Sequence, residues 1–273
     1  MTHAVITRLR RSLTEWVHHA GNRQFLHDDQ SEQLRLALGD PRRRNQLHVS
    51  AWMLGSWLCG HGMVRAVDGE VQGFDDVRIG QTLRRTSLLL RHMNQAPQRR
   101  GGRTQLPFSR QHGAWTALLG LAFDDPGAEP LYDLLRDEPE TSFGEGEALP
   151  LFVRELLTLR HGGRPTLTPR LGPFHGVLDA WNAEPRLFAQ RLAEVLDGHV
   201  ASTSGPGAMF DDPGCKLFPV EVFAVRSVRR WLELPMPKVE HALMFTNLAT
   251  MAPVGPWPSH ELAQRVERAL GRR

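Results

Sequence analysis

The chain has 273 residues, of which 41% are hydrophobic and 23% are charged. This balance is typical of a folded globular protein and excludes a largely disordered chain. No apolar stretch approaches the roughly 20 residues that a membrane-spanning helix needs, and residues 1–8 turn polar at once, unlike a signal peptide. We therefore expect a cytoplasmic protein that has no membrane partner.

The basic residues give the chain a formal net charge of +3. Lysine occurs only at Lys216 and Lys238, so nearly all of the 33 basic residues are arginine. Such a preference is as typical of GC-rich codon usage as of phosphate binding, and the net charge is small for a chain of this length. The charge alone is therefore weak evidence for a nucleic-acid partner.

Apolar residues recur at helical spacing through most of the chain. In residues 185–199, Phe188, Leu192 and Val195 share one helix face, and Pro185 suits the first helical turn. Similar patterns predict helices at 3–20, 31–38, 42–58, 76–93, 109–122, 129–136, 149–159, 173–181, 218–232 and 259–270. The valines of 218–232 leave a strand as the alternative there. Short turns join these segments, so we predict an all-α fold, either a multi-helix bundle or an array of helical hairpins.

Three segments interrupt the helical pattern. Residues 63–74 are expected to form one small β-hairpin with Asp68-Gly69 at its turn. Residues 95–108 and 201–215 are long polar loops, and long loops in compact domains often carry function. We expect a single helical domain over residues 1–273, with a subdivision near 95–110 as the alternative.

Several residues are candidates for metal-binding or catalytic groups. His27-Asp28 resembles the doublet of metal-dependent phosphohydrolases, which also need an upstream helical His and a distant Asp, but residues 28–31 fit better as a cap before the next helix. Cys59 and Cys215 are far apart in the sequence, and we favour two buried free thiols over a disulfide.

Other motifs of catalysis are incomplete. The chain has no Gly-x-Ser-x-Gly turn, and the glycine-bearing loops at 101–104 and 204–207 lack the ending of a phosphate-binding loop. Capping and solvation explain the acid pairs, which are Asp124-Asp125, Glu145 with Glu147, and Asp211-Asp212. We predict no catalytic, cofactor-binding or metal-binding residues, hence no enzyme. A helical metal-dependent hydrolase remains one alternative.

Arginine clusters support a second alternative, a helical regulator that binds nucleic acid. Four clusters lie in the first 110 residues: Arg8 with Arg10 and Arg11, Arg42-Arg43-Arg44, Arg84-Arg85, and Arg99-Arg100 with Arg103. Each could contact phosphates. However, the chain has a single Tyr, and its Trp residues lie in apolar helical contexts rather than among arginines as stacking platforms. A nucleic-acid partner is therefore not our preferred interpretation.

The second half of the chain contains segments of a recognisable order. These are 174–178 (FHGVL), 188–199 (FAQRLAEVLDGH), 217–225 (LFPVEVFAV) and 234–241 (LPMPKVEH). Over roughly residues 171–250, and more loosely at 34–40, the chain resembles the immunity protein 49 family of bacterial polymorphic-toxin systems. Those all-helical proteins carry a helix ending near a His, then a helix with a leucine–proline–x–glutamate start, then a short segment before a Pro.

The resemblance implies a non-enzymatic protein that binds a cognate toxin and neutralises it, by covering its active site. Contact residues in such proteins vary with the toxin, so none carries over to this chain. The two long loops are where we expect partner contacts, at Arg99, Arg100 and Arg103, or at Asp211 and Asp212. The sequence does not indicate an oligomeric state.

Overall fold

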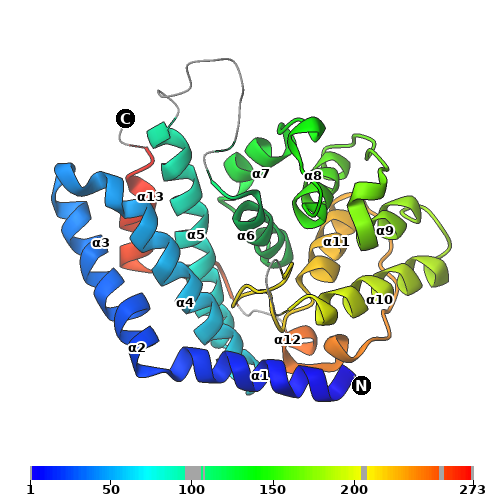
Figure 1. Cartoon of the computed structure of the whole chain (residues 1–273), viewed down its shortest axis with the longest axis horizontal. Helices are drawn as coiled ribbons and strands as arrows, with labels where there is room; N and C mark the ends of the chain where they lie inside the picture. Colours follow the sequence, from blue (N-terminus) through cyan, green and yellow to red (C-terminus); the bar gives the residue numbers. More distant parts are fainter. Residues whose placement is uncertain (1, 96–105, 107, 204–207, 252–254, 272–273) are drawn as a thin grey trace.

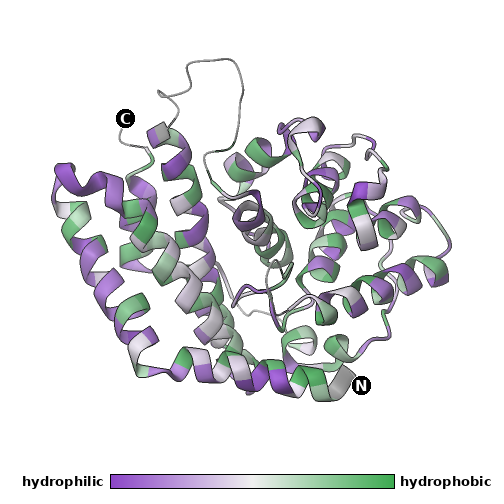
Figure 2. Cartoon of the chain, viewed as in Figure 1, coloured by the Kyte–Doolittle hydropathy of each residue, from purple (hydrophilic) through white to green (hydrophobic). Residues whose placement is uncertain are grey.

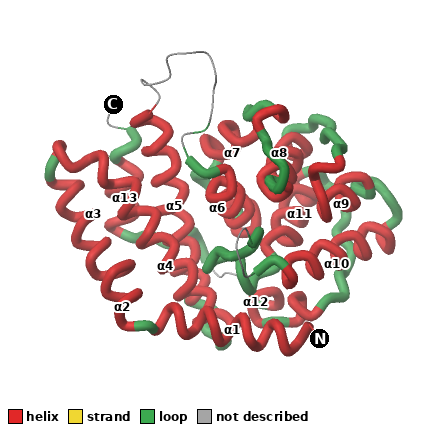
Figure 3. The backbone as a smooth tube through the Cα atoms, in the orientation of Figure 1, coloured by secondary structure: helices red, strands yellow, loops and turns green. Residues whose placement is uncertain are grey.

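The computed structural model describes the chain except for residues 1, 96–105, 107, 204–207, 252–254 and 272–273. The described residues form helices joined by turns and loops, with no β-strand among them (Figures 1 and 3). The all-α prediction is confirmed, and residues 220–231 are helical rather than a strand. No helix in the described part of the chain combines the length and apolarity needed to cross a membrane.

The N-terminal half is built around two long antiparallel helices, α4 and α5 (Figure 1). Helix α13, from the C-terminal end of the chain, returns to pack against α3 and α5. The elements of this half are α1 (Thr2–His18), α2 (Ala20–Arg23), the π-helical turn η1 (Gln24–Asp28), α3 (Asp29–Gly39), the 3-10 turn η2 (Pro41–Gln46), α4 (Leu47–Val67), α5 (Gly73–Gln95) and α13 (Glu261–Arg268).

The second half packs shorter helices around α6 and α11, which contact each other directly. Its helices are α6 (Arg110–Phe123), α7 (Glu129–Arg136), α8 (Ala148–Arg160), α9 (His175–Asp179), α10 (Pro185–Ala201), α11 (Val220–Trp231) and α12 (Asn247–Thr250). Its 3-10 turns are η4 (Glu140–Ser142), η5 (Pro169–Phe174) and η6 (Ala242–Phe245). Each helix expected from the sequence is present, and most ends are shifted by a few residues. The helix expected at 42–58 differs more, because α4 starts after a 3-10 turn and continues nine residues further, to Val67.

The predicted β-hairpin at 63–74 is wrong. Helix α4 continues to Val67, a tight turn follows in which Gly69 has a φ of 97°, and α5 begins at Gly73. The turn was therefore placed correctly, but the flanking apolar residues follow the helical period. Met63 and Ala66 before the turn, and Phe74 and Val77 after it, are all buried on the same side of this helical hairpin.

Four glycines allow α4 and α5 to touch through their backbones. Gly55 and Gly62 on α4 face Gly80 and Gly73 on α5, and each pair on one helix is seven residues apart. A Cβ added to Gly62 would lie 2.3 Å from the carbonyl oxygen of Gly73, and one added to Gly80 would lie 2.5 Å from that of Gly55. No side chain fits at these crossings, so the glycines set the distance between the two helices.

The hydrophobic core extends through both halves. One large cluster of buried side chains includes residues from α1 through α12, and a smaller one joins α3, α4, α5 and α13. Hydrophilic residues run along the outer helix α3, whereas α6 is mostly hydrophobic (Figure 2). Single-domain organisation stays a prediction, and much of the alternative boundary at 95–110 lies outside the described residues.

Two short helices begin with histidine caps that require a neutral ring. The Nδ1 atom of His241 accepts a hydrogen bond from the backbone N–H of Leu243 at 3.2 Å, and that of His260 accepts one from Ala263 at 3.4 Å. Burial is the main cause that lowers the pKa of both rings below the ordinary value. Protonation of Nδ1 would remove the acceptor and leave the helix N–H without its partner.

We expect the free energy of unfolding to fall as the pH drops below about 6.5, the reference pKa of histidine. Burial also lowers the pKa of His48 and His112, so four rings are protonated more readily in the unfolded chain than in the folded one. The contribution of these rings to the free energy of unfolding is present above that pH and is lost as the pH falls. Urea unfolding between pH 8 and pH 5.5 measures it. His260→Asn keeps a capping side chain that does not titrate, so the free energy of unfolding of this variant should depend less on pH. A pH dependence equal to that of the wild type would contradict this account.

Candidate partner-binding surface

The predicted contact residues of the two long loops have different outcomes. Arg99, Arg100 and Arg103 lie outside the described residues. Asp211 has a half-exposed side chain that pairs with Lys216 at 2.5 Å, so its role as a contact residue stays a prediction. Asp212, in contrast, is only 2% exposed and therefore cannot reach a partner in this conformation.

Asp212 forms a buried ion pair with Arg84 of α5. The two carboxylate oxygens accept hydrogen bonds from the two terminal guanidinium nitrogens at 3.0 and 2.8 Å, and the guanidinium also lies 4.6 Å from the ring centroid of Trp52. One carboxylate oxygen additionally accepts the backbone N–H of Gly214. We therefore correct the prediction for Asp212: it anchors the loop before α11 to α5 and is not a surface contact.

Arg85, the next residue of α5, is buried as well. Its guanidinium donates to Asp125 at 2.7 Å and also pairs with Glu267 of α13. Asp125 also accepts the backbone N–H of Gly127 at 2.9 Å, as predicted for a capping residue, but it is buried rather than solvated. Burial is the main cause that raises its pKa. Because Arg84 and Arg85 are inside the protein, this cluster offers no phosphate contacts and the nucleic-acid alternative loses one of its four supports.

The cysteines are buried free thiols, as predicted. Cys59 packs beside the loop that carries Cys215: a Cβ added to Gly214 would lie 3.0 Å from the Cβ of Cys59. Burial raises the pKa of the Cys59 thiol to about 11 and that of Cys215 well above its usual value. Both thiols are therefore protonated at neutral pH and are poor nucleophiles.

The doublet His27-Asp28 lies near the surface in η1. The His27 ring and the Asp28 carboxylate are 2.7 Å apart, and Asp28 makes no capping hydrogen bond because η1 runs directly into α3. The predicted cap is therefore wrong. Within the part of the chain that the structure describes, no group of three or more His, Cys, Asp and Glu side chains is arranged to hold a metal ion.

The segments that carry the family resemblance meet through a buried histidine–glutamate pair. The Nδ1 atom of His199, near the end of α10, lies 2.9 and 3.0 Å from the carboxylate oxygens of Glu221, at the start of α11. The His199 ring stacks on Phe210 at 4.0 Å, and both members of the pair are fully buried. Sequence analysis missed this contact, since no pattern relates two residues 22 positions apart.

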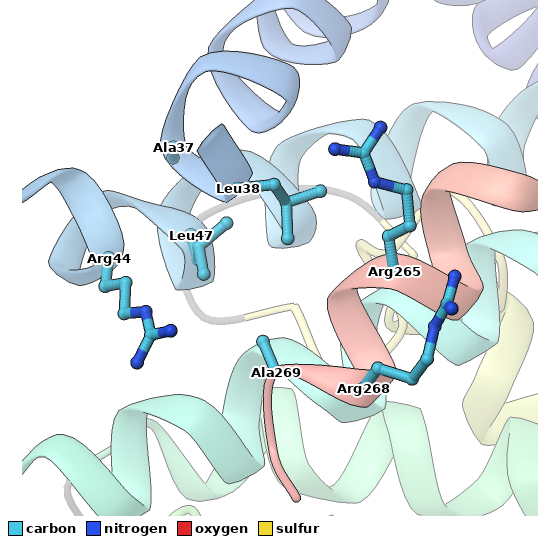
Figure 4. Close-up of a pocket in the computed structure, with 7 residues that line it drawn as sticks. All are labelled: Ala37, Leu38, Arg44, Leu47, Arg265, Arg268 and Ala269. Atoms are coloured by element: carbon cyan, nitrogen blue, oxygen red, sulfur yellow. The ribbon is translucent and has the colours of Figure 1, made fainter. Parts of the chain in front are cut away.

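A pocket lined by three arginines lies between the N-terminal helices and α13 (Figure 4). It has a volume of about 220 Å³. Figure 4 shows Arg265 and Arg268 extending from α13 on one side and Arg44 from η2 on the other, with the short apolar side chains between them. We call this site the arginine pocket; its lining is Ala37, Leu38, Arg44, Leu47, Arg265, Arg268 and Ala269.

The guanidinium groups of the arginine pocket are weakly paired. Arg265 lies 3.7 Å from Glu261, whose side chain is 84% exposed, and Arg268 donates to the backbone oxygen of Gln264 at 3.3 Å. Among the described residues, Arg44 and Arg268 have no carboxylate within 4 Å. The pocket therefore combines positive charge that is available to an anion with an apolar floor.

The elements around the pocket explain why these arginines meet. The small side chains of Ala37 and Ala269 allow α3 and α13 to approach, and Val266 of α13 is fully buried in the smaller core cluster. Arg265 and Arg268 stand three residues apart, which places them on one helix face. The sequence predicted the helix at 259–270 and singled out Arg42-Arg43-Arg44, but it did not relate the two, because Arg265 and Arg268 are more than 200 residues away from Arg44 in the chain.

Comparison of the chain with protein-family models, with characterised proteins and with solved structures found no match. The resemblance to immunity proteins thus stays a prediction that rests on the segments quoted above.

Proposed function

We propose that this protein is an immunity protein that binds a cognate bacterial toxin, and that the arginine pocket contacts an acidic part of the toxin surface. The observation that carries the proposal is a pocket that Arg44 lines on one side and Arg265 and Arg268 on the other, with apolar side chains between them. Arginine forks pair with carboxylates in two-point geometry and bind them more strongly than neutral donors do. An acidic protein surface is the partner that suits such a pocket.

The helical frame supports a binding role. The pocket side chains project from α3, η2, α4 and the α13 segment. Helices α3, α4 and α13 share a packed core, and the Arg85–Glu267 pair ties α13 to α5. A surface that is already ordered before binding loses less conformational entropy when a partner docks. The pocket lining includes no aromatic ring, and single-stranded nucleic-acid sites commonly use aromatic rings as stacking platforms. We therefore favour carboxylates over nucleic acid as the anion.

Reversing the charge of the pocket should weaken toxin binding. In the triple variant Arg44→Glu, Arg265→Glu, Arg268→Glu, we expect an affinity at least about tenfold lower, mostly through slower association, and a weaker dependence on salt. The measurement is the binding kinetics of the purified variant with the protein encoded immediately upstream of its gene, at two salt concentrations.

A matched control variant separates the effect of the pocket on binding from the effect of net charge. The variant Arg11→Glu, Arg23→Glu, Arg186→Glu changes the charge equally at three exposed arginines that lie outside the pocket. It should bind like the wild type apart from a small loss of association rate at low salt. Equal effects of the two triple variants would argue against the pocket, whereas no binding by the wild-type protein would argue against the toxin partner itself.

A further inference from the structure

A second depression lies between α11 and the segment that follows it. It has a volume of about 340 Å³ and is lined mainly by apolar side chains. We call it the apolar groove; the lining residues used below are Phe223, Met236, Met244 and Phe245, with the cations Arg226 and Lys238. None of these residues lines the arginine pocket, so the two are separate surfaces.

The apolar part of the groove has the composition of a protein-binding site. Phe245 is 61% exposed, which is unusual for a large aromatic side chain, whereas Phe223 is buried and forms a fixed wall. Met236 and Met244 are half-buried beside them. Aromatic residues and methionine are enriched in protein interfaces, and methionine adapts its shape to different partners.

Arg226 gives the groove a positive edge. Its guanidinium lies 4.0 Å from the ring centroid of Phe223, and no carboxylate among the described residues lies within 4 Å of it. Burial and the like charge of Arg230 lower the pKa of Arg226, with only Asp124 acting in the opposite direction. Lys238 is already paired with Glu240 at 2.6 Å. Arg226 is therefore the charge in this groove that a bound carboxylate would compensate.

We propose that the apolar groove binds a peptide segment of a partner protein in which an apolar side chain stands next to a carboxylate. The apolar side chain packs among Met236, Met244 and Phe245, and the carboxylate pairs with Arg226. The volume accommodates the side chains of a short peptide segment, and the exposed Phe245 supplies apolar area at the rim. The proposal goes beyond toxin binding at the arginine pocket, because it concerns a different surface and a different recognition chemistry.

Two fluorescein-labelled hexapeptides test the proposal without the toxin. Both contain a central leucine–phenylalanine pair, which is flanked by glutamates in one and by lysines in the other. At low ionic strength, the wild-type protein should bind the glutamate peptide at least about fivefold more tightly. Arg226→Glu should remove or reverse this preference, and Phe245→Ser should weaken the binding of both peptides. Fluorescence anisotropy measures the affinities.

Phe25→Ser is the matched control, because Phe25 is 53% exposed on η1 and does not line the groove. Its affinities should equal those of the wild type, and thermal unfolding should show that all variants are folded. Equal affinity for the two peptides, or an equal loss in Phe25→Ser and Phe245→Ser, would overturn the proposal. Sedimentation provides a further outcome: a wild-type dimer that Phe245→Ser converts to a monomer would show that a second copy covers the groove, which would also overturn it.

Discussion

Replacing Asp212 with asparagine is expected to lower the free energy of unfolding by about 3–5 kcal/mol, the range for removing one partner of a buried ion pair. The reason is the fully buried guanidinium of Arg84, which would keep its charge and lose its carboxylate. The loop before α11 would also lose its anchor to α5, so Cys215 should become reactive toward thiol reagents. Denaturant unfolding and thiol labelling measure the two effects.

Asp211→Asn is the natural control for this variant. The neighbouring carboxylate is half-exposed and pairs with Lys216, so its removal should change the free energy of unfolding by at most about 0.5 kcal/mol. A stable Asp212→Asn protein with protected thiols would show that the buried ion pair does not hold the loop. The same result would reopen the assignment of Asp212 as a surface contact.

Gly62→Ala should destabilise the protein by about 2 kcal/mol or more. Alanine has a helix propensity about 1 kcal/mol more favourable than glycine, which alone would stabilise α4. However, the new methyl group would lie 2.3 Å from the carbonyl oxygen of Gly73 and 2.8 Å from the backbone nitrogen of Val77. Backbone atoms cannot move out of the way as a flexible side chain can, so α4 and α5 must separate. The free-energy cost of this overpacking exceeds the gain from the higher helix propensity of alanine.

Gly39→Ala tests the effect of helix propensity on stability without overpacking. Gly39 ends α3, and a Cβ added there meets nothing within 4 Å, so this variant should be neutral or up to about 1 kcal/mol more stable. Urea unfolding of both variants gives the comparison. Equal stability of Gly62→Ala and the wild type would mean that the two helices are not held in backbone contact.

Local signals in the sequence were enough to find the helices. Periodicity and capping residues act over a few positions, and α7 has the predicted limits, Glu129–Arg136. The error at 63–74 arose because Asp68-Gly69 suits a turn between helices as well as one between strands. The packing of α4 on α5 had a signal as well: glycines stand seven residues apart at 55 and 62, and again at 73 and 80.

The interior ion pairs and the surfaces were less accessible to sequence analysis. Arg84 and Asp212 are 128 residues apart, and Arg85 and Glu267 are 182 apart, so no local pattern relates them. Acidic residues in loops and arginines in clusters suggest solvent exposure, yet Arg84, Arg85 and Asp212 are buried, and each of these charges has a partner. The arginine pocket likewise depends on the return of α13 to α3, which only the folded chain shows.

The interior ion pairs change where contacts with the proposed toxin are expected. Asp212 is excluded as a surface contact in this conformation, Asp211 remains exposed, and the arginine pocket offers three weakly paired cations. Of the arginine clusters noted in the sequence, Arg42-Arg43-Arg44 contributes Arg44 to this pocket. The proposed contact with an acidic toxin surface is therefore assigned to the arginine pocket, which is separate from the apolar groove.

The most direct test of the account is the growth of cells that express the protein encoded immediately upstream of this gene. If that protein is the cognate toxin, its expression should arrest growth, and co-expression of the wild-type chain should restore it. The charge-reversed variant at Arg44, Arg265 and Arg268 should restore growth poorly although it accumulates in folded form. Arrest that the wild-type chain does not relieve, with no complex of the two proteins on co-purification, would contradict the proposed function.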